Sequence, residues 1–349
     1  MFIKYFLSII KYVIMGPTFY SSPGQSTLFS GFGELLTTTY RAYNSKKPAD
    51  QVSKHNALFR RLNEKNNMKT LDGGLSIVEP LDYQANSTYQ RYSGYDTLNI
   101  GALDVITAAE YPWRQAAVNI AVSGLELRTN TGANRIINLA KSKITNAERS
   151  FANNLATDLY SDGSAANQIG GIQAIVADTP TNTVGGIDAS TWAFWKNIVQ
   201  SAAAPLQGGS AIVPSATTIE SLMLPLYLRL TRGADHPDII VASEDYFTFY
   251  EQSQTSIKRY SSSDEAQGGF ISLKYKLADV FFDAAASGIP GAHMYFLNTD
   301  FIKFQAHQDA NMTIMPELQA VNQDAMVTPI LFQGNVTCSA RFLQGVLKA

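Results

Sequence analysis

The sequence is short of charge. Asp, Glu, Lys and Arg make up 16% of the 349 residues, against about 25% in a typical soluble chain, while 45% of the residues are hydrophobic. Uncharged polar residues, glycine and tyrosine take the place of the missing charge. Such groups cost less to bury than ions, and interface cores are depleted in charge and enriched in Tyr, Phe and Met. The composition therefore favours a protein that covers much of its surface with partners.

The formal net charge is −2, so no global basic field exists to attract nucleic acid. The single cysteine, Cys338, excludes an intrachain disulfide and fits a reducing compartment. The apolar run MFIKYFLSIIKYVI at residues 1–14 contains Lys4 and Lys11 and is too short to span a membrane, which takes roughly 20 apolar residues. No small-residue cleavage site follows it. Two interpretations of residues 1–14 stay open: a start codon assigned too far upstream, or an amphipathic arm that packs on a neighbour.

The familiar motifs of active sites are missing. The sequence has no GxxxxGK[ST], GxGxxG, HExxH, CxxC or GxSxG, which excludes the phosphate loops, dinucleotide fingerprints, zinc helices and nucleophile elbows that they mark. The four histidines are His55, His236, His293 and His307. Only His293 and His307 could be neighbours on strands, and no acidic cluster near them completes a metal site. We therefore predict no catalytic, cofactor or metal site, and no enzyme.

Two short segments resemble sites but have simpler interpretations. The tetrad Asp235-His236-Pro237-Asp238 is either a catalytic or metal dyad or, as we favour, a turn that leads into the strand DIIVAS. Glu244-Asp245, after that strand, is expected to begin a helix, where carboxylates meet the positive end of the dipole. Cys338 lies in an apolar run and is expected to be a packed core thiol.

The hydrophobic pattern predicts an α+β protein in which helices flank a central sheet. The strongest helical signal is the apolar face of residues 133–160, formed by Ile136, Ala140, Ile144, Ala147, Phe151, Leu155 and Leu159. Further helices are expected within residues 49–70, 190–203, 217–233 (interrupted at Pro225) and 244–257. Strands are expected from LNIGALDVI, AVNIAV and DIIVAS and in residues 270–283, 293–305 and 326–343.

A tyrosine-rich segment, DYQANSTYQRYSGYD, lies between two of the expected strands. It has almost no aliphatic side chains with which to form a core. Its only cation is Arg91, which is too little charge to follow a phosphate backbone. Tyrosine with little charge is better suited to protein contact. We predict that Tyr83, Tyr89, Arg91, Tyr92 and Tyr95 make contacts between subunits.

The order of these parts resembles the major capsid proteins of tailed bacteriophages, with the HK97-like coat fold. The resemblance rests on GGLSIVEPLDYQ, ANRIINLAKSKITNAERSFANNLATDLYSDG, GGIQAIVAD and DIIVASEDYFTFYEQ, and extends from about residue 16 to the end. It implies a division into an N-terminal arm (1–48), an N-terminal helix (49–70), an extended β-hairpin loop or E-loop (71–130), the spine helix of a peripheral domain (131–164), an axial domain (165–310) and C-terminal strands that return to the peripheral domain (311–349).

What the resemblance implies for function is a structural subunit that self-assembles, as hexamers and pentamers, into an icosahedral head enclosing double-stranded DNA. The implied partners are other copies of the chain, scaffolding, portal and decoration proteins, and packaged DNA held nonspecifically on the inner face, with no membrane. The implied locations are the virion capsid and, during assembly, the host bacterial cytoplasm. The alternatives are an encapsulin-like compartment shell and a hydrolase with a scattered triad.

Some relatives join their loops through a lysine-to-asparagine isopeptide bond. Here no lysine occurs between Lys69 and Lys141, so the loop lacks the amine that this bond needs. We therefore predict a shell held by noncovalent contacts.

Overall fold

The computed structural model describes residues 57–101, 104–129, 139–254, 272–283, 288–316, 318–319 and 323–349. These residues belong to one compact unit. The expected arm, the first part of the expected N-terminal helix and His55 lie outside them. No helix within these ranges is long and apolar enough to cross a membrane.

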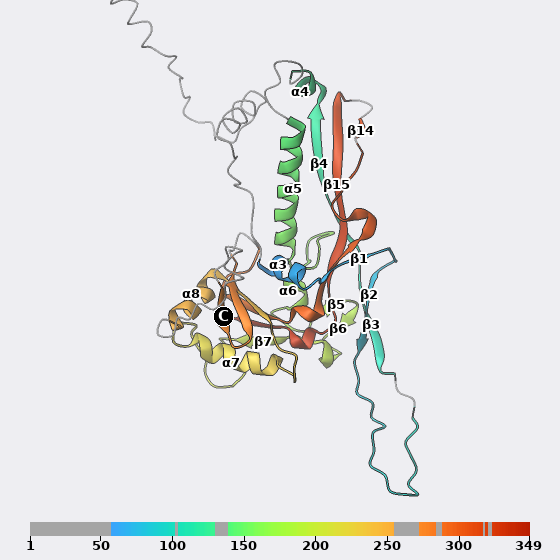
Figure 1. The fold of residues 1–349 in the computed structure, drawn as a ribbon. Helices are drawn as coiled ribbons and strands as arrows, with labels where there is room; N and C mark the ends of the chain where they lie inside the picture. Colours follow the sequence, from blue (N-terminus) through green and yellow to red (C-terminus); the bar gives the residue numbers. More distant parts are fainter. Residues whose placement is uncertain are drawn as a thin grey trace, which may run out of the picture. The chain divides into compact units, whose positions relative to one another are not determined.

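The helices are α3 (Ala57–Glu64), α4 (Gly124–Thr129), α5 (Leu139–Asp158), α6 (Ile172–Ile175), α7 (Ile219–Leu230) and α8 (Glu244–Ser253). Short 3-10 turns are η2 (Ala193–Trp195), η4 (Thr299–Phe301), η5 (Gln308–Ala310) and η6 (Arg341–Leu343). The described part of the expected spine is α5, and α8 begins at the predicted Glu244 (Figure 1). The N-terminal helix ends earlier than expected, because residues 68–71 form a strand.

The strands form two large sheets and two small ones. The long sheet holds β1 (Met68–Leu71), β12 (Ile302–His307), β15 (Ala325–Cys338) and β13 (Thr313–Ile314) in that order, with β14 (Leu318–Gln319) and β4 (Arg114–Ser123) also paired to β15. The central sheet has the order β7 (Ile198–Ser201), β16 (Gly345–Lys348), β11 (His293–Leu297), β8 (Ile239–Ala242), β10 (Ala278–Phe282), β9 (Ser272–Tyr275). The small sheets are β2 (Ile77–Asp82) with β3 (Ile106–Tyr111), and β5 (Thr183–Val184) with β6 (Ile187–Asp188).

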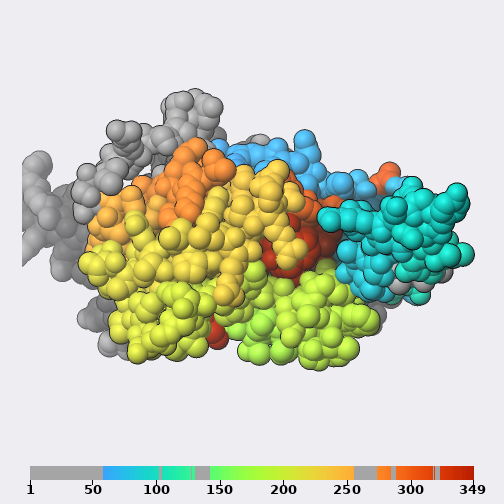
Figure 2. Space-filling view, turned by 90° about the horizontal axis from the view of Figure 1, so that it is seen from below, coloured from blue at the N-terminus to red at the C-terminus, as the bar shows by residue number. Residues whose placement is uncertain are grey.

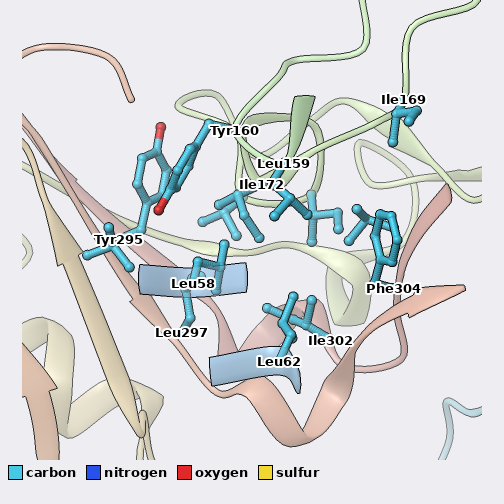
Figure 3. Packing of buried hydrophobic residues seen from close by; sticks show 14 of the residues in the cluster. Leu58, Leu62, Leu159, Tyr160, Ile169, Ile172, Tyr295, Leu297, Ile302 and Phe304 are labelled. Carbon is cyan, nitrogen blue, oxygen red and sulfur yellow. The ribbon is translucent and has the colours of Figure 1, made fainter. Parts of the chain in front are cut away.

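The central sheet is buried on both faces, as its strand β8 illustrates. Ile239 and Val241 pack into a cluster with residues of α3, α5 and α6, part of which Figure 3 shows. Ile240 and Ala242 point the other way, into a cluster with α7 and α8. A strand covered on both faces carries a continuous apolar run and not an alternating one, which is why DIIVAS is so apolar.

Three predictions about this region were wrong. The expected helix at residues 190–203 is instead η2 followed by β7. Ile198 and Val199 pair in parallel with Gly345 and Val346 of β16, and β-branched residues suit a strand. Trp195 has the spacing of a helical face, but its indole N–H donates to the Val184 carbonyl oxygen at 2.9 Å and fixes the turn before the strand.

The second wrong prediction is the interruption of a helix at Pro225. Helix α7 continues through Pro225 without interruption. Proline removes a backbone N–H and frees the carbonyl four residues earlier, here that of Ser221. The Gln207 side-chain amide donates to that carbonyl oxygen at 3.5 Å. A side chain from outside the helix therefore satisfies the group that proline leaves open.

The third wrong prediction concerns which sheet the strands β12 and β16 join. Of the C-terminal strands, β15 joins the long sheet but β16 inserts between β7 and β11 of the central sheet. Conversely β12, expected with the axial part, joins the long sheet. His293 on β11 and His307 on β12 are consequently in different sheets and are not strand neighbours. An apolar strand can pair in either sheet, so its sequence alone does not choose between them.

Candidate assembly interface

The stem of the predicted loop is the β2–β3 hairpin. The strands pair antiparallel from Ile77 opposite Tyr111 to Asp82 opposite Ile106. Expected to span residues 71–130, the loop in fact ends at β3, because β4 belongs to the long sheet. One face of the stem is buried in a small cluster with Trp195, and the Tyr111 hydroxyl donates to the Cys338 carbonyl oxygen at 3.0 Å. The stem is thus fixed to the body of its own chain.

A buried carboxylate strengthens this attachment. Glu79 lies on the inner face of β2 between Ile77 and Leu81. Its carboxylate accepts from the Lys303 ammonium at 2.7 Å and from the Thr337 hydroxyl at 3.1 Å, and also from the Gln305 amide. Glu79 was not among the residues predicted from the sequence to have a role. The alternation of apolar Ile77 and Leu81 around it was the available signal, because it puts Glu79 on the buried face.

Tyr83, the first of the predicted contact residues, lies at the base of the hairpin. Its ring packs on Trp192 and Phe194, with centroid distances of 5.9 and 5.4 Å. It also lines two open clefts of about 500 and 480 Å³, one on the side of Arg232 and Phe342 and one beside Trp192. Tyr83 is therefore partly buried against its own chain, unlike the four residues beyond it.

The tip of the hairpin, residues 84–101 and 104, exposes most of its side chains to solvent. Tyr89 is 83% exposed, Tyr92 66%, and Tyr95 and Arg91 are exposed as well. Hydrogen bonds within the tip are local, such as Ser93 N–H to the Asp96 carboxylate at 2.8 Å. Figure 1 shows the tip extending away from the stem, and on the face seen in Figure 2 no other described segment covers it. Three exposed tyrosines on an extended loop are a surface with no partner in the described chain.

The segments that resembled sites have structural roles. Asp238, at the end of the predicted turn, accepts from Thr299 N–H at 2.6 Å and from the Thr299 hydroxyl at 2.7 Å, and pairs with Lys65 at 3.0 Å. Burial favours a higher pKa for Asp238, but the Thr299 hydrogen bonds and the Lys65 charge outweigh it and lower the pKa. The Asp238 carboxylate therefore links Lys65, just after α3, to the start of β8 in the central sheet.

Cys338, His293 and His307 are likewise held by burial or by contacts within the chain. Cys338 is fully buried, as predicted, and burial raises the pKa of its thiol to about 12. His293 Nε2 lies 2.9 Å from the Asp178 carboxylate, and His307 Nδ1 accepts from the Asp309 N–H at 3.1 Å. Among the residues that the structure describes, no three His, Cys, Asp or Glu side chains group to hold a metal ion.

The fold is that of phage capsid subunits. A solved cyanophage A-1(L) capsid asymmetric unit aligns with a TM-score of 0.63 at 14% identity, over 81% of this chain and 90% of that chain. The capsid of the native GTA particle aligns with a TM-score of 0.52 at 12% identity, over 96% of this chain and 97% of that chain. The capsid of the empty GTA particle aligns with a TM-score of 0.51 at 13% identity, over 88% of this chain and 96% of that chain. No protein-family model matches the chain, and no curated protein matches it by sequence.

At these identities the likeness concerns the fold. The chain has the mixed α+β, HK97-like architecture predicted from its order of parts, and that prediction is confirmed.

Proposed function

We propose that this chain is a structural subunit that assembles with copies of itself into the icosahedral capsid of a tailed bacteriophage around double-stranded DNA. The observation that carries the proposal is the capsid-subunit fold, aligned over 81% of this chain and 90% of the cyanophage chain. The exposed tyrosines of the tip support it. Scaffolding, portal and decoration proteins, and DNA on the inner face, are its proposed further partners. It acts in the virion capsid and, before that, in the host cytoplasm, without catalysis.

The tip supplies the subunit contact in this proposal, through Tyr89, Arg91, Tyr92 and Tyr95. A tyrosine buries roughly 150–250 Å², so three of them supply more than half of the ~800 Å² that one partner contributes to a standard interface. Tyr83 has a different role here. It stacks at the base of the hairpin and sets the direction in which the tip leaves the body.

Assembly of the purified chain tests the proposal. Sedimentation and negative-stain microscopy should show closed particles, and particles from phage should contain double-stranded DNA; protein cargo in place of DNA would indicate an encapsulin-like compartment. A chain that stays monomeric at high concentration would overturn the proposal. Denaturing gels of intact particles should show single chains, because the loop has no lysine for a covalent link.

Substitutions in the tip distinguish an effect on contacts between subunits from an effect on folding. Joint replacement of Tyr89, Tyr92 and Tyr95 by Ser should abolish particles and leave a folded chain, because the rings that bury surface in the partner are gone. The matched control replaces the same three residues by Phe, which keeps the rings and removes only the hydroxyls. Particles that form normally from the serine variant would show that the tip is not a contact.

A further inference from the structure

The strand β4 is an edge of the long sheet. It pairs antiparallel with β15 along its whole length, from Arg114 opposite Gly334 to Ser123 opposite Ala325, without a bulge. No other described strand pairs with β4. Its second edge therefore presents main-chain donors and acceptors that the ladder does not use.

The contacts of β15 and β4 show which residues face that open edge. Pro329, which lies opposite Asn119, has no N–H, and its carbonyl oxygen accepts from Met315 N–H at 2.9 Å on the side away from β4. The pair of Asn119 and Pro329 is therefore a non-hydrogen-bonded pair of the ladder. The N–H and C=O of Asn119, and by the period of two those of Gln115 and Ala117, point to the open edge.

The far end of the same edge confirms this alternation. The Ala121 carbonyl oxygen accepts from the Lys143 ammonium at 3.0 Å, and Ser123 N–H donates to the Glu126 carboxylate at 3.1 Å. Lys143 and Glu126 also pair with each other at 2.7 Å. Side chains of α5 and α4 thus cap the edge at Ala121 and Ser123. No described residue caps it at Gln115, Ala117 or Asn119.

Natural sheets protect exposed edges with lysine, proline or bulges. Two other edge strands follow this rule, β1 with Lys69 and β9 with Lys274. β4, at ten residues, is longer than either and has no charge beyond Arg114 at its start. A long, straight and uncharged edge is the kind that pairs with another strand.

A segment with a strand-like sequence pattern, but with no ladder partner among the described residues, lies in the hairpin tip. The segment Thr97–Gly101 has alternating apolar residues, and the sequence predicts a strand there, yet the hairpin ladder begins only at Ile106. Leu98 is 57% exposed and Ile100 92%. Among the described residues, the Thr97 carbonyl oxygen accepts only from the Gln90 side chain, and Gly101 N–H donates only to the Asn99 side chain.

We propose that Thr97–Gly101 of one copy adds as a strand to the β4 edge of a second copy, at Gln115–Asn119. This inference rests on the proposed function, in which copies assemble. Figure 1 shows the tip and β4 extending in opposite directions from the β2–β3 stem, so a chain does not reach its own edge with its own tip. Strand addition supplies main-chain hydrogen bonds for affinity, and alternate side chains supply specificity.

The sheet face that receives Leu98 and Ile100 is the face opposite α5. Val118, Ile120 and Ile330 point to α5, so their neighbours along the strands point to the opposite face. At Gln115–Asn119 that face carries Ala117 opposite Leu331, between Gln115 opposite Gln333 and Asn119 opposite Pro329. The small Ala117 leaves room beside Leu331, where an apolar side chain of the added strand loses its exposure to water.

Ala117→Pro is the direct test. It removes the N–H that faces the incoming strand and spares the β4–β15 ladder, which does not use it, and proline is tolerated on edge strands. Particle yield should fall at least tenfold while circular dichroism stays that of the wild type. The matched control, Ala117→Val, keeps the N–H and should assemble. If the wild type forms no particles, the proposed function fails; if Ala117→Pro assembles as the wild type does, the strand addition fails.

Cross-linking identifies the segment that binds the β4 edge. It also tests the strand addition if the Ala117→Pro variant does not fold. Chains carrying Asn119→Cys and chains carrying Ile100→Cys are mixed before assembly and then oxidised. A disulfide-linked dimer containing one chain of each kind is expected, since native Cys338 is buried. Ser93→Cys, elsewhere in the exposed tip, replaces Ile100→Cys in the control mixture. Equal dimer yield in the two mixtures would overturn the assignment of Thr97–Gly101, and another segment would then occupy the edge.

Discussion

The central sheet and the hairpin tip treat apolar side chains in opposite ways. In the central sheet, β8 and β11 are covered on both faces by residues of the same chain. In the tip, tyrosine, leucine and isoleucine side chains stand in water. The central sheet finds its partners within the chain, and for the tip we propose a partner in another copy of the chain. Changes in the central sheet should therefore act on folding, and changes in the tip on assembly.

The largest effect is expected for Phe296→Ala. Phe296 is fully buried between β11 and the helices α7 and α8, and removing such a ring costs about 3–5 kcal/mol through lost burial and the cavity left behind. Denaturant unfolding of the chain measures the free energy. A loss below about 1 kcal/mol would show that this cluster is loosely packed.

Glu79→Ala, at the junction of the two regions, should cost about 3 kcal/mol, because it leaves the Lys303 ammonium partly buried without its carboxylate. The double variant with Lys303→Met is the control, and it should be more stable than Glu79→Ala alone because no unpaired charge remains. Equal stability of the two variants would show that the ion pair does not hold the stem to the long sheet.

A smaller effect is expected from acid. The pKa of Asp238 is lower in the folded than in the unfolded chain, where it is about 4. Asp238 therefore contributes stability above about pH 4, and this contribution is lost as the pH falls through the folded pKa. Unfolding at a series of pH values from 6 to 2 should show this loss. Asp238→Asn should reduce it, and an unchanged pH profile in that variant would assign the loss to other carboxylates.

The smallest effect on folding is expected for Tyr95→Ser in the tip. The side chain is exposed, and substitutions of this kind usually change the free energy of unfolding by less than about 0.5 kcal/mol. Assembly, measured by light scattering, should nevertheless slow. A stability loss above about 1 kcal/mol would mean that the tip packs on its own chain.

The sequence by itself determined the elements with strong periodicity or a complete apolar run. α5, α8 and β8 lie where their patterns predict them, and the burial of Cys338 follows from its apolar surroundings. These features depend on local propensity and on the spacing of apolar residues, which a single segment carries.

Only the tertiary structure decided which segments meet. β16 joins the central sheet, Gln207 satisfies the carbonyl that Pro225 leaves open, and Glu79 is buried because Lys303 and Thr337 reach it from β12 and β15. Each of these depends on residues far away in the sequence, so no local pattern contains it. The same is true of the open edge of β4, beside which no described strand pairs.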